Sequence, residues 1–521
     1  MKLLPLVVGL VVSVGTAQAA PKAVKPPPDL LVSIAVGGDA SLDGVRAFAN
    51  AVKPGAGLML SGGMLRGQLA QMIGATGLDG FDPNAGITLL ISDTPAASGG
   101  AIGFAVLGKI SDDKEFASHT GVAFSMVKDH WALLGPKETV AKLAPFALAQ
   151  LAGQPAPVVP TATAYVPNVL ARYKPQIDAA RAAIHAQLTK TSPGSPTFVD
   201  VYADGLFSVL ADADRAVIAL DLGKDLGAID MALVPRAGTR LAQFVALQRP
   251  SDYGLVAKLP PGAPPMLFAG HFDSGPYHAG MLEALTNLYG GGSGATPLVG
   301  ALEAAMKAAN GELAMSVTMK PGTGMAFVEI AGITDERAAA AAFDKMFAAL
   351  RSGYSYDHLG IKTTIAAIPP IAYDGISVSG ISTKFDTTKA TPAQAAAMAA
   401  MAPTGTHDSR IAVLDHLMVA ASGSDAQMTQ AIDAIRGKAA YKPAPQIATL
   451  LAWSRAHKDS IAMVMDMGGL AGMMGGPPNP MMAKLGAMLF TVGAADGNAH
   501  VRFVLPTASV AAMAGIGAGK P

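Results

Sequence analysis

The chain carries two kinds of apolar pattern, one with the spacing of helices and one with the spacing of strands. Between positions 42 and 52 the apolar residues share one face of an amphipathic helix. They are Leu42, Val45, Phe48, Ala49 and Val52. By contrast, 87–92 and 101–107 are apolar at most positions, which indicates strands covered by helices. Short turns connect most of these segments, and short turns favour antiparallel pairing of strands.

A repeat along the chain extends this interpretation. Three pairs of segments resemble each other and follow the same order in both halves. They are 104–116 (FAVLGKISDDKEF) with 327–339 (FVEIAGITDERAA), 127–134 (VKDHWALL) with 413–420 (VLDHLMVA), and 223–235 with 493–506. We predict an α+β fold of two related units, 29–250 and 251–515. Each unit is a curved, mostly antiparallel sheet with helices on its concave side, and the two sheets join edge to edge.

The paired segments also predict local structure. Ser111 and Thr334 follow a strand and precede acidic residues, so we expect their hydroxyl groups to cap the N-termini of helices. Asp129-His130 and Asp415-His416 occupy matching places between two strands. Because Asp favours turns by bonding to its own backbone, both dipeptides are expected at the tips of hairpins rather than in a catalytic site.

The first residues have the composition of a secretory signal peptide. Lys2 precedes an apolar run that ends in Ala-Gln-Ala at 17–19, a pattern that signal peptidase accepts. We expect a cleaved signal peptide at 1–19 and a Pro-rich linker at 20–28. The chain has no cysteine, which excludes disulfides and zinc–thiolate sites. Export without disulfides favours a periplasmic or secreted protein of a Gram-negative bacterium.

The charge of the chain narrows the partners. It holds 38 Lys and Arg and 38 Asp and Glu, and charged residues are only 15%. Nucleic-acid binding depends on clustered positive charge, and no run of Lys or Arg occurs, so no nucleic-acid partner is expected. After signal cleavage, no apolar stretch of transmembrane length is free of proline or charge, so no transmembrane segment is expected.

A methionine-rich segment stands out near the C-terminus. Residues 467–488 form an insertion interrupted by prolines, directly after the strand that carries Met463 and Met465. The candidate ligand-binding residues are Met463, Met465, Met473, Met474, Met481 and Met482. Three interpretations stay open: methionines filling an irregular core, a pliable apolar flap over a groove, or a thioether site for Cu(I).

A second candidate site lies in the stretch GHFDSGPYH. His271 and Asp273 share a face of a strand, and the following turn can return His278 toward them. Two imidazoles and a carboxylate suit zinc or another divalent metal, which would imply a metal-dependent hydrolase. The alternative is a strand that leads into a helix, with Asp273 or Ser274 as the cap.

The sequence contains no motif that is specific for an enzyme. Our leading hypothesis is an exported, non-enzymatic protein with no cofactor, which binds a hydrophobic ligand or partner in an apolar concavity. The partner would be a lipid, a hydrophobic peptide or an envelope protein. The alternatives are the hydrolase at His271, Asp273 and His278, and a purely structural envelope protein.

Overall fold

The structure, a computed structural model, describes residues 24–94, 102–119, 123–191, 205, 207–289, 292–320, 324–358, 360–473 and 486–511. The expected signal peptide and the first residues of the linker lie outside these ranges. In the described part of the chain, no helix is long and apolar enough to cross a membrane.

The first half of the chain supplies eight strands and most of the helices that pack on them. Its strands are β1 (Leu30–Val36), β2 (Ile87–Ser92), β3 (Gly103–Lys109), β4 (Phe124–Lys128), β5 (Trp131–Gly135), β6 (Thr161–Tyr165), β7 (Ala213–Leu222) and β8 (Leu226–Pro235). Its helices are α1 (Asp43–Val52), α2 (Gly62–Ile73), α3 (Asp113–His119), α4 (Lys137–Phe146), α5 (Val166–Arg172), α6 (Lys174–Thr191) and α8 (Arg240–Leu247).

The second half is larger because it carries three additional strands. Its strands are β9 (Met266–His271), β10 (Ala309–Lys320), β11 (Gly324–Ile333), β12 (Tyr354–His358), β13 (Ile361–Tyr373), β14 (Ile376–Asp386), β15 (Thr406–Leu414), β16 (Leu417–Ser422), β17 (Asp459–Asp466), β18 (Ala487–Ala495) and β19 (Asn498–Pro506). Its helices are α9 (His278–Leu288), α10 (Gly292–Ala308), α11 (Glu336–Ala349), α12 (Pro392–Met401), α13 (Asp425–Ile435), α14 (Pro445–Ala456) and α15 (Met467–Met473).

All these strands belong to one 19-stranded sheet, whose neighbouring strands pair antiparallel. From the edge to the centre, the first half runs β4-β5-β3-β2-β1-β6-β7-β8. From the opposite edge, the second half runs β12-β13-β14-β15-β16-β11-β10-β9-β17-β18-β19. The large antiparallel sheet agrees with the predicted α+β class.

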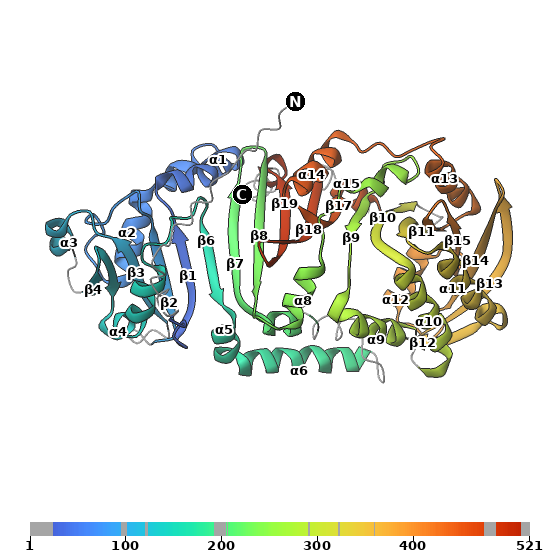
Figure 1. The fold of residues 1–521 in the computed structure, drawn as a ribbon, viewed down its shortest axis with the longest axis horizontal. Helices are drawn as coiled ribbons and strands as arrows, with labels where there is room; N and C mark the ends of the chain where they lie inside the picture. Colours follow the sequence, from blue (N-terminus) through green and yellow to red (C-terminus); the bar gives the residue numbers. More distant parts are fainter. Residues whose placement is uncertain are drawn as a thin grey trace, which may run out of the picture.

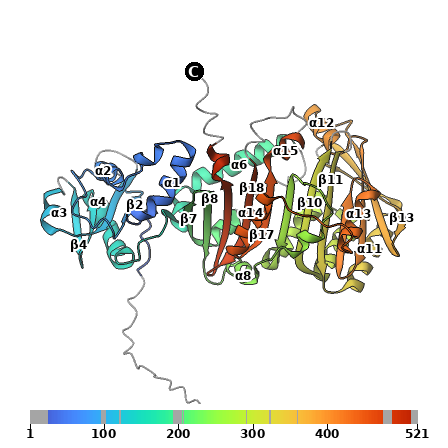
Figure 2. The same ribbon diagram turned by 90° about the horizontal axis from the view of Figure 1, so that it is seen from above.

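The two halves meet where β8 pairs with β19. Figure 1 shows the result: the last strands of the chain lie in the middle of an elongated molecule, beside the green β7 and β8. The view from above shows the same central position of β8 and β18 (Figure 2). The expected edge-to-edge pairing is therefore present as one continuous sheet.

A network of buried polar side chains crosses this junction. Arg502 of β19 donates from Nε to Asp230 of β8 at 3.0 Å, and its Nη1 reaches Asp459 of β17. The side chains of Arg502 and Asp459 are 6% and 0% exposed. Ser454 donates to Asp459 Oδ2 at 2.7 Å, and Tyr253 lies 2.7 Å from the Ser454 hydroxyl. Buried charges of this kind are tolerated because each has a partner of opposite charge.

Helices cover both faces of the sheet, so the expectation of a single helical layer on a concave side is wrong. Alternate residues of β15 contact different helices. Ala412 packs in a core with α13, whereas Ile411 and Val413 pack in a core with α10 and α11. A strand that is apolar at nearly every position is buried on both faces of the sheet. Such a pattern does not predict which face a given helix covers.

The local predictions had mixed outcomes. Asp129 and His130, and likewise Asp415 and His416, have positive φ angles at the tips of their hairpins, which confirms the turn interpretation. The predicted caps were wrong. Asp112 and Asp335 accept from the backbone at the start of α3 and α11, each at 2.9 Å.

The two hydroxyl groups bond elsewhere. Ser111 Oγ donates to the carbonyl oxygen of Gly80, and Thr334 Oγ1 donates to that of Ala308. Ser111 thus links the end of β3 to the segment before β2, and Thr334 links the end of β11 to the segment before β10. The carboxylate one position later is left to cap the helix, where the helix dipole also favours its charge.

Candidate functional site

A cavity of about 730 Å³ lies between helices and sheet in the second half. Helix α10 contributes Leu302 and Met306 to its walls, and α11 contributes Phe343. The sheet side is formed by residues of β10, β11, β15 and β16. These are Leu313, Glu329, Ala331, Ile411, Met418 and Ala420. Volume and apolar lining are those of a typical site for a small ligand.

One carboxyl group lies among these apolar side chains. Glu329 sits near the middle of β11, between Met315 of β10 and Ala420 of β16. No hydrogen bond or ion pair engages its carboxyl group within the ranges that the structure describes. Burial raises the pKa of Glu329, because an apolar environment disfavours the charged form.

Most polar residues at one end of the cavity already have partners. Asp273 Oδ1 accepts from the backbone N–H of Gly275 at 2.9 Å. The hydroxyl of Ser274 lies 3.1 Å from Nδ1 of His278. Glu312 accepts from Ser251 at 3.0 Å. The first two contacts hold Asp273, Ser274 and His278 within one loop, and the third ties Glu312 of β10 to the segment before β9.

Lys307 also lines this end, but its charge is taken up outside the cavity. Its Nζ lies 2.6 Å from Oε1 of Glu303. The hydrogen bond and charge of Lys307 lower the pKa of Glu303. Because this pair is exposed, it contributes little to stability.

The three residues predicted to bind a metal, His271, Asp273 and His278, all line this cavity. Among the residues with described positions, no three His, Asp or Glu side chains converge to hold a metal ion. Asp273 is engaged by a backbone N–H, and His278 Nε2 faces Glu303 at 3.9 Å. His271 is buried, and its Nδ1 has no hydrogen-bond partner. The contacts of Asp273 are those of the alternative that the sequence left open, a strand that leads into a helical turn.

The paired segments of the two halves carry side chains of different size at the positions that line the cavity. In the first half, Val106 of β3 pairs with Leu134 of β5. In the second half, the residues at the corresponding places of the paired segments are Glu329 and Ala420, and these pair with each other in the same register. A buried aliphatic pair is therefore replaced by an acid and a small residue.

Two aromatic residues of the first half are missing from the second in the same way. Phe81 bridges to Ile110, and its matching position, Ala309, pairs with Ile333. Phe81 packs edge-to-face on Phe116, with ring centroids 5.5 Å apart. The place of Phe116 in the repeated segment is taken by Ala339. Three alanines, Ala309, Ala339 and Ala420, line the cavity where larger side chains fill the first half.

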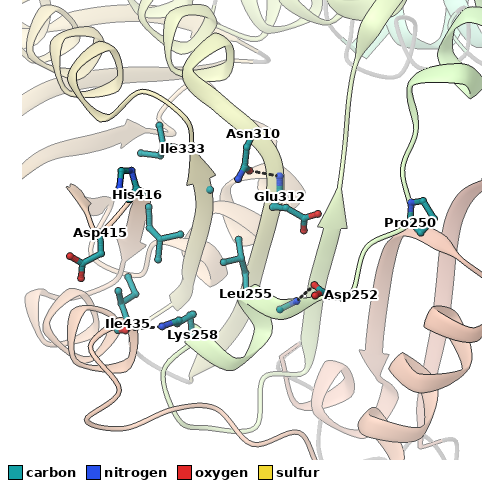
Figure 3. Close-up of a pocket in the computed structure, with 13 residues that line it drawn as sticks. Pro250, Asp252, Leu255, Lys258, Asn310, Glu312, Ile333, Asp415, His416 and Ile435 are labelled. Atoms are coloured by element: carbon teal, nitrogen blue, oxygen red, sulfur yellow. Dashed lines mark hydrogen bonds between the residues drawn. The ribbon is translucent and has the colours of Figure 1, made fainter. Parts of the chain in front are cut away.

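A second cavity, of about 720 Å³, shares Asn310, Glu312, Gly332 and Ile333 with the first. Figure 3 shows its lining spread over the loop before β9, the start of β10 and the hairpin tip with Asp415 and His416. Lys258 donates to the carbonyl oxygen of Ile435 at 3.1 Å, and Asp252 accepts from Gly254 at 2.8 Å. Because these charged groups are engaged by the backbone, this cavity offers less to a ligand than the first.

The methionines predicted to bind a ligand are placed in part. Met463 and Met465 lie on β17 with half-buried side chains, and neither lines the two cavities. A cross-strand row on the same face leads from Met463 through Phe268 and Met315 to Glu329. The apolar surface around Met463 therefore continues toward the floor of the first cavity.

The other predicted methionines are not placed. Met473 is described only as the last residue of α15, and Met474, Met481 and Met482 lie outside the described residues. In topology, the Met-rich connection between β17 and β18 corresponds to the connection between β6 and β7, which contains α5 and the long α6. Both halves thus carry an additional segment at this place.

No family model and no curated protein matches this chain. Two solved structures, titled "Structure of crystal form III of TP0453" and "Structure of crystal form I of TP0453", show a low similarity. They are 9% and 10% identical, with TM-scores of 0.25 and 0.24. The matches cover 52% and 51% of this chain, and 99% and 98% of the other chains. At these scores neither likeness bears on fold or function.

Sequence reasoning missed Glu329 as a site residue, although the repeated segments contained the signal. Val106 is replaced by Glu329, and Phe116 by Ala339, within one pair of segments. One of the two paired segments thus has an acid in the middle of an apolar strand and small residues where the other has large side chains. This combination is typical of a polar group that lies in a cavity. The meaning of these replacements becomes clear once the strand register shows that Glu329 pairs with Ala420.

Proposed function

We propose that this protein binds a hydrophobic small molecule in the cavity between α10, α11 and the sheet of the second half. The observation that carries the proposal is the replacement of Phe81, Phe116 and Leu134 by Ala309, Ala339 and Ala420. Proteins close-pack their cores, and an unfilled cavity costs stability. The small residues leave an apolar recess of about 730 Å³ that is partly open to solvent, and such a recess supports a site that a ligand can enter and fill.

We also propose that the chain consists of two related units, and that the cavity described above belongs to the second. The order of strand pairing is the same in both halves, apart from the additional β12, β13 and β14. The register supports this relation. Lys109 pairs with Trp131, and the corresponding residues Gly332 and Leu417 also pair.

The place of action belongs to the proposal as well. The apolar run and Ala-Gln-Ala at 17–19 support export, and we propose a periplasmic or secreted protein. If so, N-terminal sequencing of protein recovered outside the cytoplasm will begin at Ala20. A protein that begins at Met1 in that fraction would contradict a cleaved signal peptide.

Filling the cavity tests the binding function. The substitutions Ala420→Leu and Ala339→Phe restore the side chains of the first half. We expect each to weaken binding of the neutral dye Nile red by at least about tenfold, because dye and side chain compete for the same volume. Ala400→Leu, an exposed position on α12, is the matched control and should bind like the wild type.

Two outcomes would overturn the proposed function. In one, the wild-type protein gives no increase in Nile red fluorescence. In the other, the filled variants keep a cooperative thermal transition and still bind the dye with unchanged affinity. The second result would place the dye elsewhere, and a purely structural envelope protein would then be the better description.

A further inference from the structure

Glu329 gives the cavity a polar centre that packing does not require. Its counterpart, Val106, is fully buried in the core of the first half, so an aliphatic side chain fits this scaffold. A buried polar group without a partner costs free energy. Glu329 is half-buried and has no hydrogen-bond or ion-pair partner in the described part of the chain. It is therefore less favourable than valine for the unliganded fold, and a bound molecule that supplies a partner makes it favourable.

The charges around the cavity restrict what that partner is. Its lining contains three acids, Asp273, Glu312 and Glu329. Among the described residues of the lining, the single Lys or Arg is Lys307, and its ammonium is paired with Glu303. An anionic head group would meet uncompensated acids, whereas a cationic one would meet a free carboxylate.

A metal ion does not satisfy this carboxyl group equally well. No set of three metal-binding side chains converges in the portion of the chain that is described. Glu329 pairs with Ala420, and Met418 and Phe343 line the same cavity. A small hydrated cation would be placed among apolar side chains, while the apolar body of an organic ligand would be buried there favourably.

We propose that the ligand is an amphipathic amine, whose ammonium group pairs with Glu329 while its apolar body fills the space between α10, α11 and the sheet. This inference rests on the proposed function. It adds the chemical class of the ligand and the residue that selects it. Glu329 is in this view a specificity-determining residue, and the small alanines provide the volume.

Displacement of Nile red by three twelve-carbon probes tests the inference. Dodecylamine, dodecanol and dodecanoate share one apolar chain and differ in the head group. They are compared at pH 7.5 and below their micelle concentrations. We expect the wild type to bind dodecylamine roughly tenfold or more tightly than dodecanol, the contribution of a hydrogen bond to a charged group. Dodecanoate should bind more weakly than dodecanol.

Two variants complete the experiment. Glu329→Gln keeps the shape of the side chain but removes its charge, so dodecylamine should lose its advantage while the affinity for dodecanol stays unchanged. Glu283→Gln, an exposed acid on α9, is the matched control and should keep the preference of the wild type.

The outcomes separate this inference from the proposed function. If dodecanoate binds as tightly as dodecylamine, or if Glu329→Gln keeps the preference, the amine assignment is wrong although the cavity still binds apolar molecules. If the wild-type protein binds neither Nile red nor any of the three probes, the proposed function itself fails, and the inference fails with it.

Discussion

Acids lie in the interior at two places in this protein, and their surroundings differ. Asp459 is fully buried, whereas Asp230 and Glu329 are half-buried. At the junction of the halves, Asp230 and Asp459 share Arg502, and Asp230 also lies 2.9 Å from Nδ1 of His500. In the cavity, Glu329 has no such partner in the described part of the chain. The junction acids are built for the stability of the fold, whereas the cavity acid is kept at the expense of stability, as expected for a binding residue.

The pKa values of Asp230 and Glu329 shift in opposite directions. Burial by itself raises the pKa of Asp230, but the hydrogen bond from His500 and the charge of Arg502 outweigh it, so the pKa lies below its ordinary value. For Glu329, burial acts alone and raises the pKa. A partner does not decide the direction alone: at Asp459, which shares Arg502, burial outweighs the hydrogen bond from Ser454 and the charge of Arg502, and the pKa is raised. Asp230 differs because its partners outweigh its burial.

The largest expected effect comes from breaking the junction. Arg502→Leu leaves Asp230 and Asp459 without their cation, and we expect the free energy of unfolding to fall by about 3–5 kcal/mol. Chemical denaturation measures this loss. Arg436→Leu, which breaks the exposed pair with Asp374, is the control and should cost at most about 1 kcal/mol. Equal losses in both variants would remove the distinction between the junction and the surface.

The opposite sign is expected in the cavity. Glu329→Val copies Val106 and removes a half-buried polar group without a partner, so the free energy of unfolding should rise by up to about 1 kcal/mol at neutral pH. Thermal denaturation without ligand measures the change. A loss of stability would mean that Glu329 has a structural partner, and the cavity would then resemble the junction.

A smaller effect separates the two acids by pH. Asp230 has a lowered pKa, so its stabilisation is present at neutral pH and is lost as the pH falls through its folded-state pKa. Glu329 has a raised pKa, so its penalty is absent in acid and appears as the pH rises toward its folded-state pKa.

Two variants make this pH dependence measurable. The differences in melting temperature of Asp230→Asn and of Glu329→Val from the wild type should have opposite signs at pH 7. Both should shrink toward pH 4, near the ordinary pKa of carboxyl groups. A stabilisation by Glu329→Val that is the same at pH 4 and pH 7 would show that the charge of Glu329 is not its cause.

Local chemistry made part of the fold predictable from the sequence. The tips at Asp129 and Asp415 follow from the preference of Asp for turns, and the paired segments place strands and helices in the correct order. The sequence could not predict which face of the sheet each helix covers, because a strand that is apolar at nearly every position has no distinct inner and outer face. The predicted caps were wrong by one residue, because the side chains of Ser111 and Asp112 are both able to cap the N-terminus of a helix.

The candidate site was harder to predict because it depends on what is absent. The residues His271, Asp273 and His278 are close in sequence and line one cavity, but the side chains of Asp273 and His278 bond to their own loop and Nδ1 of His271 has no hydrogen-bond partner. The cavity itself results from small residues on β10, β11, β16 and α11, which no local pattern connects. The pairing of Glu329 with Ala420 shows that the acid and one of the small residues lie side by side in the sheet.

A crystal structure of the protein grown with dodecylamine tests the central claim most directly. The account predicts density for the chain between Leu302, Phe343 and Met418, with its nitrogen within hydrogen-bond distance of the Glu329 carboxyl. An empty cavity in crystals whose protein binds dodecylamine in solution, or a chain bound only elsewhere on the molecule, would contradict it.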